Sequence, residues 1–205
     1  MERRISGVTA HPVTIEERAD GKKTISGYAA VYHRAGDPGT EYQLGEGYLE
    51  RIKAGAFDAA LAGSEDVISA FNHDPSKVIG RRSNGTLRLS SDAVGLRYEV
   101  DLNPEDPEHV SIAAKVKRGD VKGSSFAFSP KENGQRFHQE GKVRYRTLES
   151  LNLFDASPVT TPAYSGTTAG LRADGDATDA AAALAKWEAG QVAVRLRIME
   201  IQSGE

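Results

Sequence analysis

Three residue types that can together hydrolyse an amide bond occur in separate segments of the chain. His73 lies in the run AFNHD, Ser125 in the run KGSSFAF and Asp155 in the run LFDASPV. A serine hydroxyl is a weak nucleophile alone, so it needs an imidazole within hydrogen-bond reach. The imidazole in turn needs a partner that fixes its tautomer. If the fold brings them together, these residues supply a nucleophile, a base and an orienting carboxylate.

The segment around Ser125 reads as a strand whose phase separates two neighbouring serines. Phe126 and Phe128 point to one face, which we expect to be the core, so Ser125 and Ala127 point to the other face and can line a cleft. Ser124 falls on the phenylalanine face. The sequence therefore favours Ser125 over Ser124 as the nucleophile.

His73 differs from the other four histidines in its position. It follows the apolar strand predicted over 67–71 and precedes Asp74-Pro75, where a strand meets a loop. Catalytic groups concentrate at such junctions, because the strand fixes position while the loop admits substrate. The remaining histidines lie in N-terminal and loop segments, a predicted helix and a charged hairpin, namely His11, His33, His109 and His138.

Asp155 alternates with Leu151 and Leu153 and so shares a predominantly apolar strand face. A carboxylate there needs a charged or hydrogen-bonding partner, and a histidinium would serve. Two alternatives stay open from the sequence: Asp155 could cap a turn at Ser157-Pro158, or Asp74 could be the orienting acid.

Short strands punctuated by glycine dominate the chain to about residue 160. Strict alternation predicts strands over 86–90 and 95–102 with a hairpin turn between them, and further strands over 123–128, 141–147 and 148–159. Helices are predicted over 54–61 and from Asp106-Pro107 to about Lys117. The fold class is therefore mainly β with flanking helices (α+β), an antiparallel barrel or sandwich.

Composition changes after Tyr164. Gly, Thr, Ala and Asp dominate 165–179, which predicts a flexible linker, and 180–201 reads as one helix. We therefore expect a folded domain over 1–164, a linker over 165–179 and a C-terminal helical tail over 180–205.

Composition also argues against several classes of function. The formal net charge of −3, with dispersed basic residues, gives no support for nucleic-acid binding. The chain has no cysteine, no apolar run long enough to span a membrane and no signal-peptide pattern, so we expect a cytoplasmic protein. The scattered histidines and the lack of a phosphate-binding loop predict neither a metal site nor a cofactor.

The segments that carry these residues resemble the prohead (capsid maturation) proteases of tailed bacteriophages, whose fold is related to the herpesvirus assemblin serine proteases. The resemblance runs from about Ile25 to Tyr164 and includes the runs SGYAAVY, IKAGAF, VIGR and PVTTPAY. This chain has Asp155 where the family commonly has Glu, and Ser124 where it often has a larger apolar residue.

The resemblance implies an antiparallel β-barrel of the assemblin type with Ser125, His73 and Asp155 as the catalytic residues. Related viral proteases with a second histidine as the third member add His109 or His138 as alternatives. The oxyanion donors stay open between backbone amides near Ser125 or after Phe128 and the side chains of Arg136, Arg144 or Arg146.

By the same resemblance, the substrates are scaffold protein or the scaffolding segment of the major capsid protein precursor, and the chain itself. Self-association as a homo-oligomer is compatible with it. The protein would act in the host cytoplasm inside the immature procapsid, or in a bacterial cytoplasm if a prophage encodes it. The alternative function is a catalytically inactive scaffold or capsid-assembly protein in which the three residues do not meet.

Overall fold

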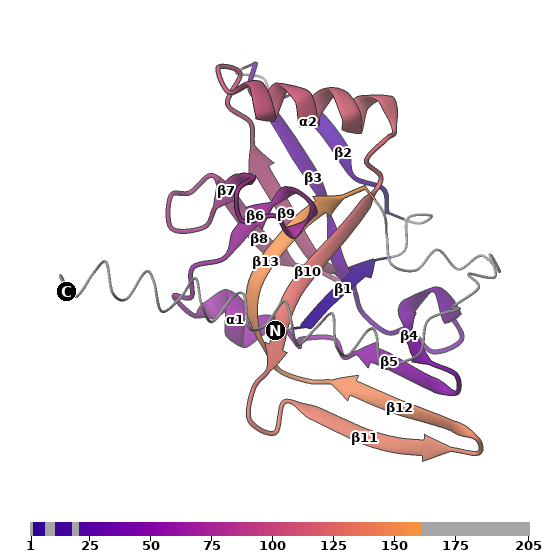
Figure 1. The fold of residues 1–205 in the computed structure, drawn as a ribbon. Coiled ribbons are helices and arrows are strands. Elements are labelled where there is room, and N and C mark those ends of the chain that lie inside the picture. The colour runs from indigo at the N-terminus through magenta and orange to yellow at the C-terminus, as the bar shows by residue number, and fades with distance from the viewer. Residues whose placement is uncertain (1, 7–10, 18–20, 161–205) are drawn as a thin grey trace, which may run out of the picture. The chain divides into compact units, whose positions relative to one another are not determined.

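The computed structural model describes residues 2–6, 11–17 and 21–160, and of 2–6 the backbone alone (Figure 1). The chain divides into two units, Met1–Thr167 and Thr168–Glu205, and every described residue belongs to the first. The predicted linker over 165–179 and the predicted helix over 180–201 lie outside the described residues, as does the domain boundary near Tyr164.

Thirteen strands of the described segments form three sheets. The first sheet has the order β1 (Glu2–Ser6), β10 (Gly123–Pro130), β13 (Leu151–Val159), β6 (Ile68–Ala70) and β7 (Val78–Arg81). The second has the order β11 (Gln135–Glu140), β12 (Val143–Leu148), β5 (Tyr48–Ile52) and β4 (Glu41–Gly45). The third has the order β2 (Thr14–Glu17), β3 (Lys23–Val31), β9 (Gly95–Asp101) and β8 (Leu87–Ser91).

The mainly β class is confirmed, but the predicted antiparallel barrel is wrong, because none of these three sheets closes on itself. Two of them are also mixed, since β13 pairs with β6 in parallel and β12 pairs with β5 in parallel. Alternation identifies a strand and its buried face, yet it carries no information on which distant strand becomes its neighbour. The pairing order was therefore outside what the sequence pattern could predict.

The first sheet packs on the third, with β10 and β13 against β3 and with β7 against β9. Aromatic rings fill part of this core. Phe126 and Phe128 stack with ring centroids 4.9 Å apart, and Phe57 meets Phe126 edge-on at 5.5 Å. Because side chains two residues apart share a strand face, burying Phe126 and Phe128 here leaves the opposite face of β10 for Ser125.

Helix α2 (Pro107–Arg118) confirms its prediction. The side chain of Asp106 accepts a hydrogen bond from the backbone N–H of Glu108, proline follows the cap, and Gly119 ends the helix with φ of 81°. Helix α1 (Asp58–Ala62) begins later than predicted, because Gly55 has φ of 85° and lies in a turn. Two short 3-10 helices, η1 (Pro38–Thr40) and η2 (Phe71–His73), complete the described elements.

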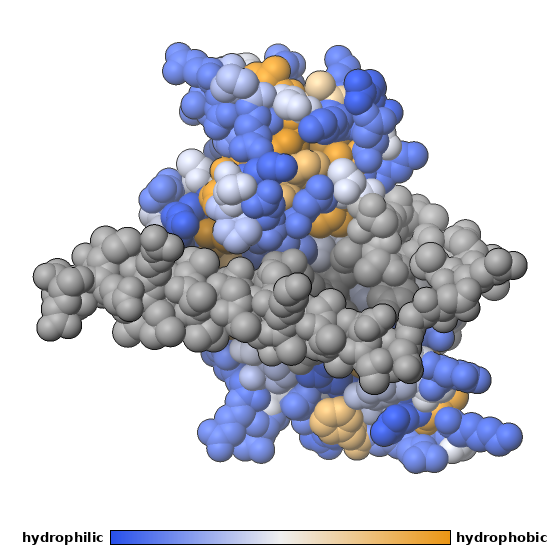
Figure 2. Space-filling model, viewed as in Figure 1, coloured by the Kyte–Doolittle hydropathy of each residue, from blue (hydrophilic) through white to orange (hydrophobic). Residues whose placement is uncertain are grey.

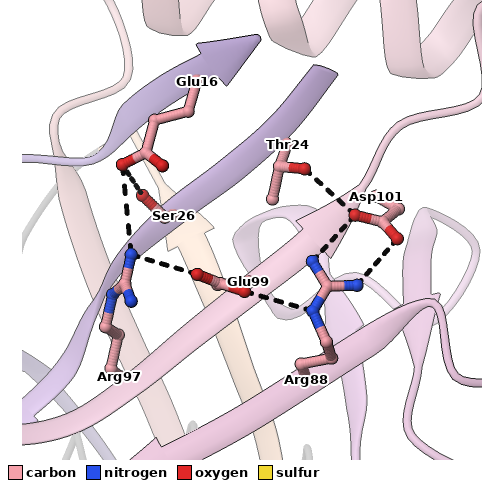
Figure 3. A network of polar contacts seen from close by, with 7 residues as sticks. All are labelled: Glu16, Thr24, Ser26, Arg88, Arg97, Glu99 and Asp101. Atoms are coloured by element: carbon pink, nitrogen blue, oxygen red, sulfur yellow. Dashed lines mark hydrogen bonds and ion pairs between the residues drawn. The ribbon is translucent and has the colours of Figure 1, made fainter. Parts of the chain in front are cut away.

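A polar network crosses the strands of the third sheet (Figure 3). Arg88 donates to Asp101 at 2.7 and 2.8 Å and to Glu99 at 3.1 Å, which joins β8 to β9. Arg97 forms ion pairs with Glu99 and with Glu16 of β2. In β3, the hydroxyl of Ser26 donates to Glu16 and the hydroxyl of Thr24 donates to Asp101. Cross-strand pairs of this kind fix register, although partly exposed ion pairs each contribute little to stability.

The close approach of β3 and β9 requires glycine at position 95. A Cβ added there would lie 2.0 Å from the carbonyl oxygen of Ala30, whereas a Cβ on Gly45 would meet nothing within 4 Å. We therefore predict that Gly95→Ala lowers the free energy of unfolding by about 1–3 kcal/mol or more. Gly45→Ala should change it by less than about 0.5 kcal/mol. Urea denaturation measures both, and equal midpoints for the two variants would contradict the described β3–β9 pairing.

Candidate active site

The two neighbouring serines of β10 point to opposite faces, as their strand phase predicts. The Oγ of Ser125 lies 2.5 Å from Nε2 of His73, a short hydrogen bond between fully or nearly fully buried side chains. Ser124 instead lies in the core between the sheets, where its Oγ is 3.1 Å from the hydroxyl oxygen of Tyr98. Of these two serines, Ser125 is therefore the one whose hydroxyl contacts an imidazole.

His73 reaches Ser125 from a strained loop. The predicted strand over 67–71 is shorter in the structure, and η2 follows it with Asn72 at φ of 56° and His73 at φ of 57°. Left-handed backbone at two consecutive non-glycine residues costs free energy and persists only where the surroundings enforce it. The side chain of Asn72 supplies one restraint by accepting hydrogen bonds from the backbone N–H and hydroxyl of Thr160, at 2.8 and 3.2 Å.

Asp155 lies on the other side of the imidazole. Its Oδ1 is 3.2 Å from Nδ1 of His73, and each side chain is only 6% exposed. The Ser157 hydroxyl donates to the same carboxylate oxygen and accepts the backbone N–H of Ala70 at 2.7 Å. Residues 157 and 158 belong to β13, so Asp155 does not cap a turn there.

The rival third members lie elsewhere. Asp74 turns into solvent, where its carboxylate accepts hydrogen bonds from the backbone and hydroxyl of Ser76. Both bonds lower the pKa of Asp74 below its usual value, and the bond from the Ser76 hydroxyl has the larger effect. His109 accepts the backbone N–H of Asn103, and His138 stacks on Tyr145, so both histidines are engaged away from Ser125.

The arginines considered for an oxyanion hole belong to the second sheet. Arg146 is buried and donates to Glu50 at 3.0 Å and to Gln135 at 2.8 Å. Arg144 lies over the ring of Tyr48, and Arg136 forms an ion pair with a carboxylate on the loop after β12, that of Glu149. In the part of the chain that the structure describes, each of the three therefore has a partner of its own.

Sequence reasoning missed two residues that support the site. Ser157 follows Asp155 by two positions on one strand, a spacing that places both side chains on the same face and could have indicated the contact. Tyr98 lies fully buried behind Ser124, and burial raises its pKa well above the usual value, so its hydroxyl stays protonated. A Cβ added at Gly27 would lie 2.7 Å from the Ser124 Oγ, so Gly27 packs tightly against Ser124.

A groove of about 1000 Å³ lies between β2 and α2, away from the candidate catalytic residues. Figure 2 shows hydrophobic residues reaching the surface between hydrophilic ones in this part of the molecule. Ser125, His73 and Asp155 do not line it. Within the described segments, no group of three or more acidic or histidine side chains could hold a metal ion. No helix there is long and apolar enough to cross a bilayer.

The fold and these contacts define a class of protein, a mainly β chain in which a serine, a histidine and a carboxylate from three separate segments meet on one side of a sheet. Residues 10–180 match the family of caudovirus prohead serine proteases, and this match covers most of the chain. The chain therefore belongs to the prohead serine protease family of tailed phages, whose members mature capsids. Comparison with curated proteins and with solved structures gives no significant match.

Ser157 and Ser69 offer a matched test of how the acid is held, because both are fully buried on neighbouring strands. Ser157→Ala removes the donor to Asp155 and the acceptor of the Ala70 N–H, so we predict a loss of about 1–3 kcal/mol in the free energy of unfolding. The Ser69 hydroxyl has no hydrogen-bond partner among the described residues, so Ser69→Ala should be neutral or stabilising. Thermal and urea unfolding compare them, and equal losses would show that the Ser157 contacts contribute nothing specific.

Proposed function

We propose that this protein is a serine endopeptidase that cleaves scaffold protein, or the scaffolding segment of the major capsid protein precursor, and its own chain during procapsid maturation. The observation that carries the proposal is the 2.5 Å contact of Ser125 with His73, backed by Asp155, in a chain of this family. The family implies capsid or scaffold proteins as substrates and the procapsid or host cytoplasm as the place of action.

In the first half of the reaction, the Ser125 Oγ attacks the carbonyl carbon of the scissile peptide while Nε2 of His73 takes the hydroxyl proton. The Asp155 Oδ1 lies 3.2 Å from Nδ1 of His73, so its charge favours the tautomer that carries the proton on Nδ1 and turns the Nε2 lone pair toward Ser125, and it stabilises the imidazolium that forms. The tetrahedral intermediate then expels the amine, which receives the proton from Nε2. The products of this half are a free amino terminus and an ester on Ser125.

In the second half, a water molecule attacks the ester carbonyl and gives its proton to Nε2 of His73. The bond to Ser125 breaks, the proton returns to Oγ, and the second peptide leaves with a carboxyl terminus. Both tetrahedral intermediates carry negative charge on the former carbonyl oxygen, and each lost donor to that oxygen typically costs about 3–4 kcal/mol. We assign these donors to backbone amides near Ser125 or in the loop after Phe128, since the candidate arginines are engaged in the second sheet.

The alternative, an inactive assembly protein with the same fold, requires that the three residues do not meet. The hydrogen bond between Ser125 and His73 favours the enzyme, because burying a serine, an imidazole and a carboxylate together is costly unless each is paired. A purely structural chain would gain more stability from apolar side chains at these positions.

The direct test of the proposal is co-expression with the cognate capsid precursor. Ser125→Ala should abolish cleavage without unfolding the protein, since it removes only one oxygen atom. Ser124→Ala should keep most of the activity, because Ser124 contacts Tyr98 on the other face of the strand. Gel analysis of precursor and product reports the outcome, and cleavage by Ser125→Ala but not by Ser124→Ala would refute the assigned nucleophile.

The same assay separates the two candidate acids. His73→Ala should be about as damaging as Ser125→Ala, because members of a catalytic unit do not contribute additively. Asp155→Asn should lower the cleavage rate by up to about 10⁴-fold while leaving measurable product. The matched control Asp74→Asn should cleave at the wild-type rate, because Asp74 is held by Ser76. Wild-type cleavage by Asp155→Asn together with loss in Asp74→Asn would reverse the assignment.

A further inference from the structure

The strand that carries Ser125 has an unusual neighbour on its outer side. β10 pairs with the nine-residue strand β13 on one side and with the five-residue strand β1 on the other, where the sheet ends (Figure 1). The register of β1 places the backbone of Ile5 opposite Ser125 and that of Ser6 opposite Ser124. A short extended segment of the chain therefore lies directly beside the candidate nucleophile.

The hydrogen bonds between β1 and β10 are main-chain bonds that any extended peptide could make. If β1 left, β10 would present a row of unpaired N–H and C=O groups at the edge of the sheet, and such edges accept added strands. A protease has to hold its substrate in an extended conformation, and an exposed strand beside the nucleophile provides the bonds for this.

The position of β1 also suits a substrate backbone. Residues opposite each other in an antiparallel pair have Cα atoms about 4.5–5.5 Å apart, so a small shift brings a carbonyl carbon into the range of the Ser125 hydroxyl. β1 runs antiparallel to β10, with Glu2 opposite Phe128 and Ser6 opposite Ser124. A peptide bound in this direction has the residues before its scissile bond beside Ala127 and Phe128. The residues after that bond lie toward Gly123.

Ser125 is fully buried, which bears on how a substrate could reach it. Its side chain is 0% exposed, so a peptide reaches it only after part of the chain moves. β1 is the described element that borders β10 on its outer side, and its displacement breaks only strand pairing at a sheet edge. Moving β13 instead would remove Asp155 and Ser157 from the site.

We propose that the outer edge of β10 is the docking edge for an extended peptide substrate, and that the segment Glu2–Ser6 occupies this edge as an intramolecular competitor. The proposal rests on the function proposed above. Substrate and segment then exclude each other. The apparent affinity for substrate equals the intrinsic affinity multiplied by the fraction of molecules in which the edge is open. If the segment holds the edge in about nine molecules of ten, its release accelerates substrate binding about tenfold.

The test uses the full chain with two consecutive prolines, Arg3→Pro/Arg4→Pro. Proline lacks an N–H, and because successive strand residues face opposite edges, one of the two changes removes a bond to β10. The matched control, Arg136→Pro/Phe137→Pro, places the same lesion in β11, the edge strand of the second sheet. Two probes report on Ser125: a tetrapeptidyl diphenyl phosphonate, which has a backbone to dock, and an alkyl fluorophosphonate, which has none.

We expect the labelling rate of the peptidyl probe, relative to that of the alkyl probe, to rise about tenfold in Arg3→Pro/Arg4→Pro and to stay unchanged in the control. An unchanged ratio, with Ser125 still labelled by the alkyl probe, overturns the docking edge and leaves the proposed function standing. If neither probe labels Ser125 in any variant, the proposed function fails and the docking edge fails with it.

Amide hydrogen exchange on the wild-type chain gives a second measurement that does not depend on how the proline variants fold. Once the peptidyl probe is attached to Ser125, the amides of β1 should lose protection while those of β13 keep theirs. Protection of β1 that persists with the peptide in place would show that the peptide docks elsewhere, and would overturn the proposal.

Discussion

The register of β13 is the constraint on which the candidate site depends. This strand carries Asp155, pairs with β10 so that Ser157 lies opposite Ser125, and pairs in parallel with β6 at the single position Asp155–Ile68. Ser157 then binds the N–H of Ala70, just before the loop that carries His73. One strand therefore sets the position of Asp155 directly, and those of His73 and Ser125 through its two neighbours.

That constraint also explains how a strained histidine loop is maintained. Asn72 and His73 both have left-handed backbone, which other residues must enforce. Thr160, which directly follows β13, holds the Asn72 side chain, and the backbone N–H of Phe71 binds the carbonyl of Lys77 at 3.0 Å. The loop is thus fixed from both sides, and the imidazole meets Ser125 without a rearrangement of its own backbone.

The sequence predicted most local features and missed the pairing of distant strands. Strand phase placed Ser125 opposite the phenylalanines, and capping residues placed α2, because both depend on neighbours along the chain. The open sheets and the parallel pairing of β13 with β6 depend on partners far away in sequence. Strand phase alone left Asp155 and Asp74 open as the residue beside His73, and only the family resemblance pointed to Asp155. Gly55 delayed the start of α1 through a left-handed turn that composition alone did not reveal.

We propose that the folded arrangement of β10, β13 and the histidine loop activates Ser125. Peptide mapping by mass spectrometry after reaction of the full-length chain with an alkyl fluorophosphonate tests it most directly. We expect one adduct per chain, located on Ser125, and none when the protein is unfolded in urea before the reagent is added. An adduct on Ser124, or equal labelling of folded and unfolded chains, would contradict it.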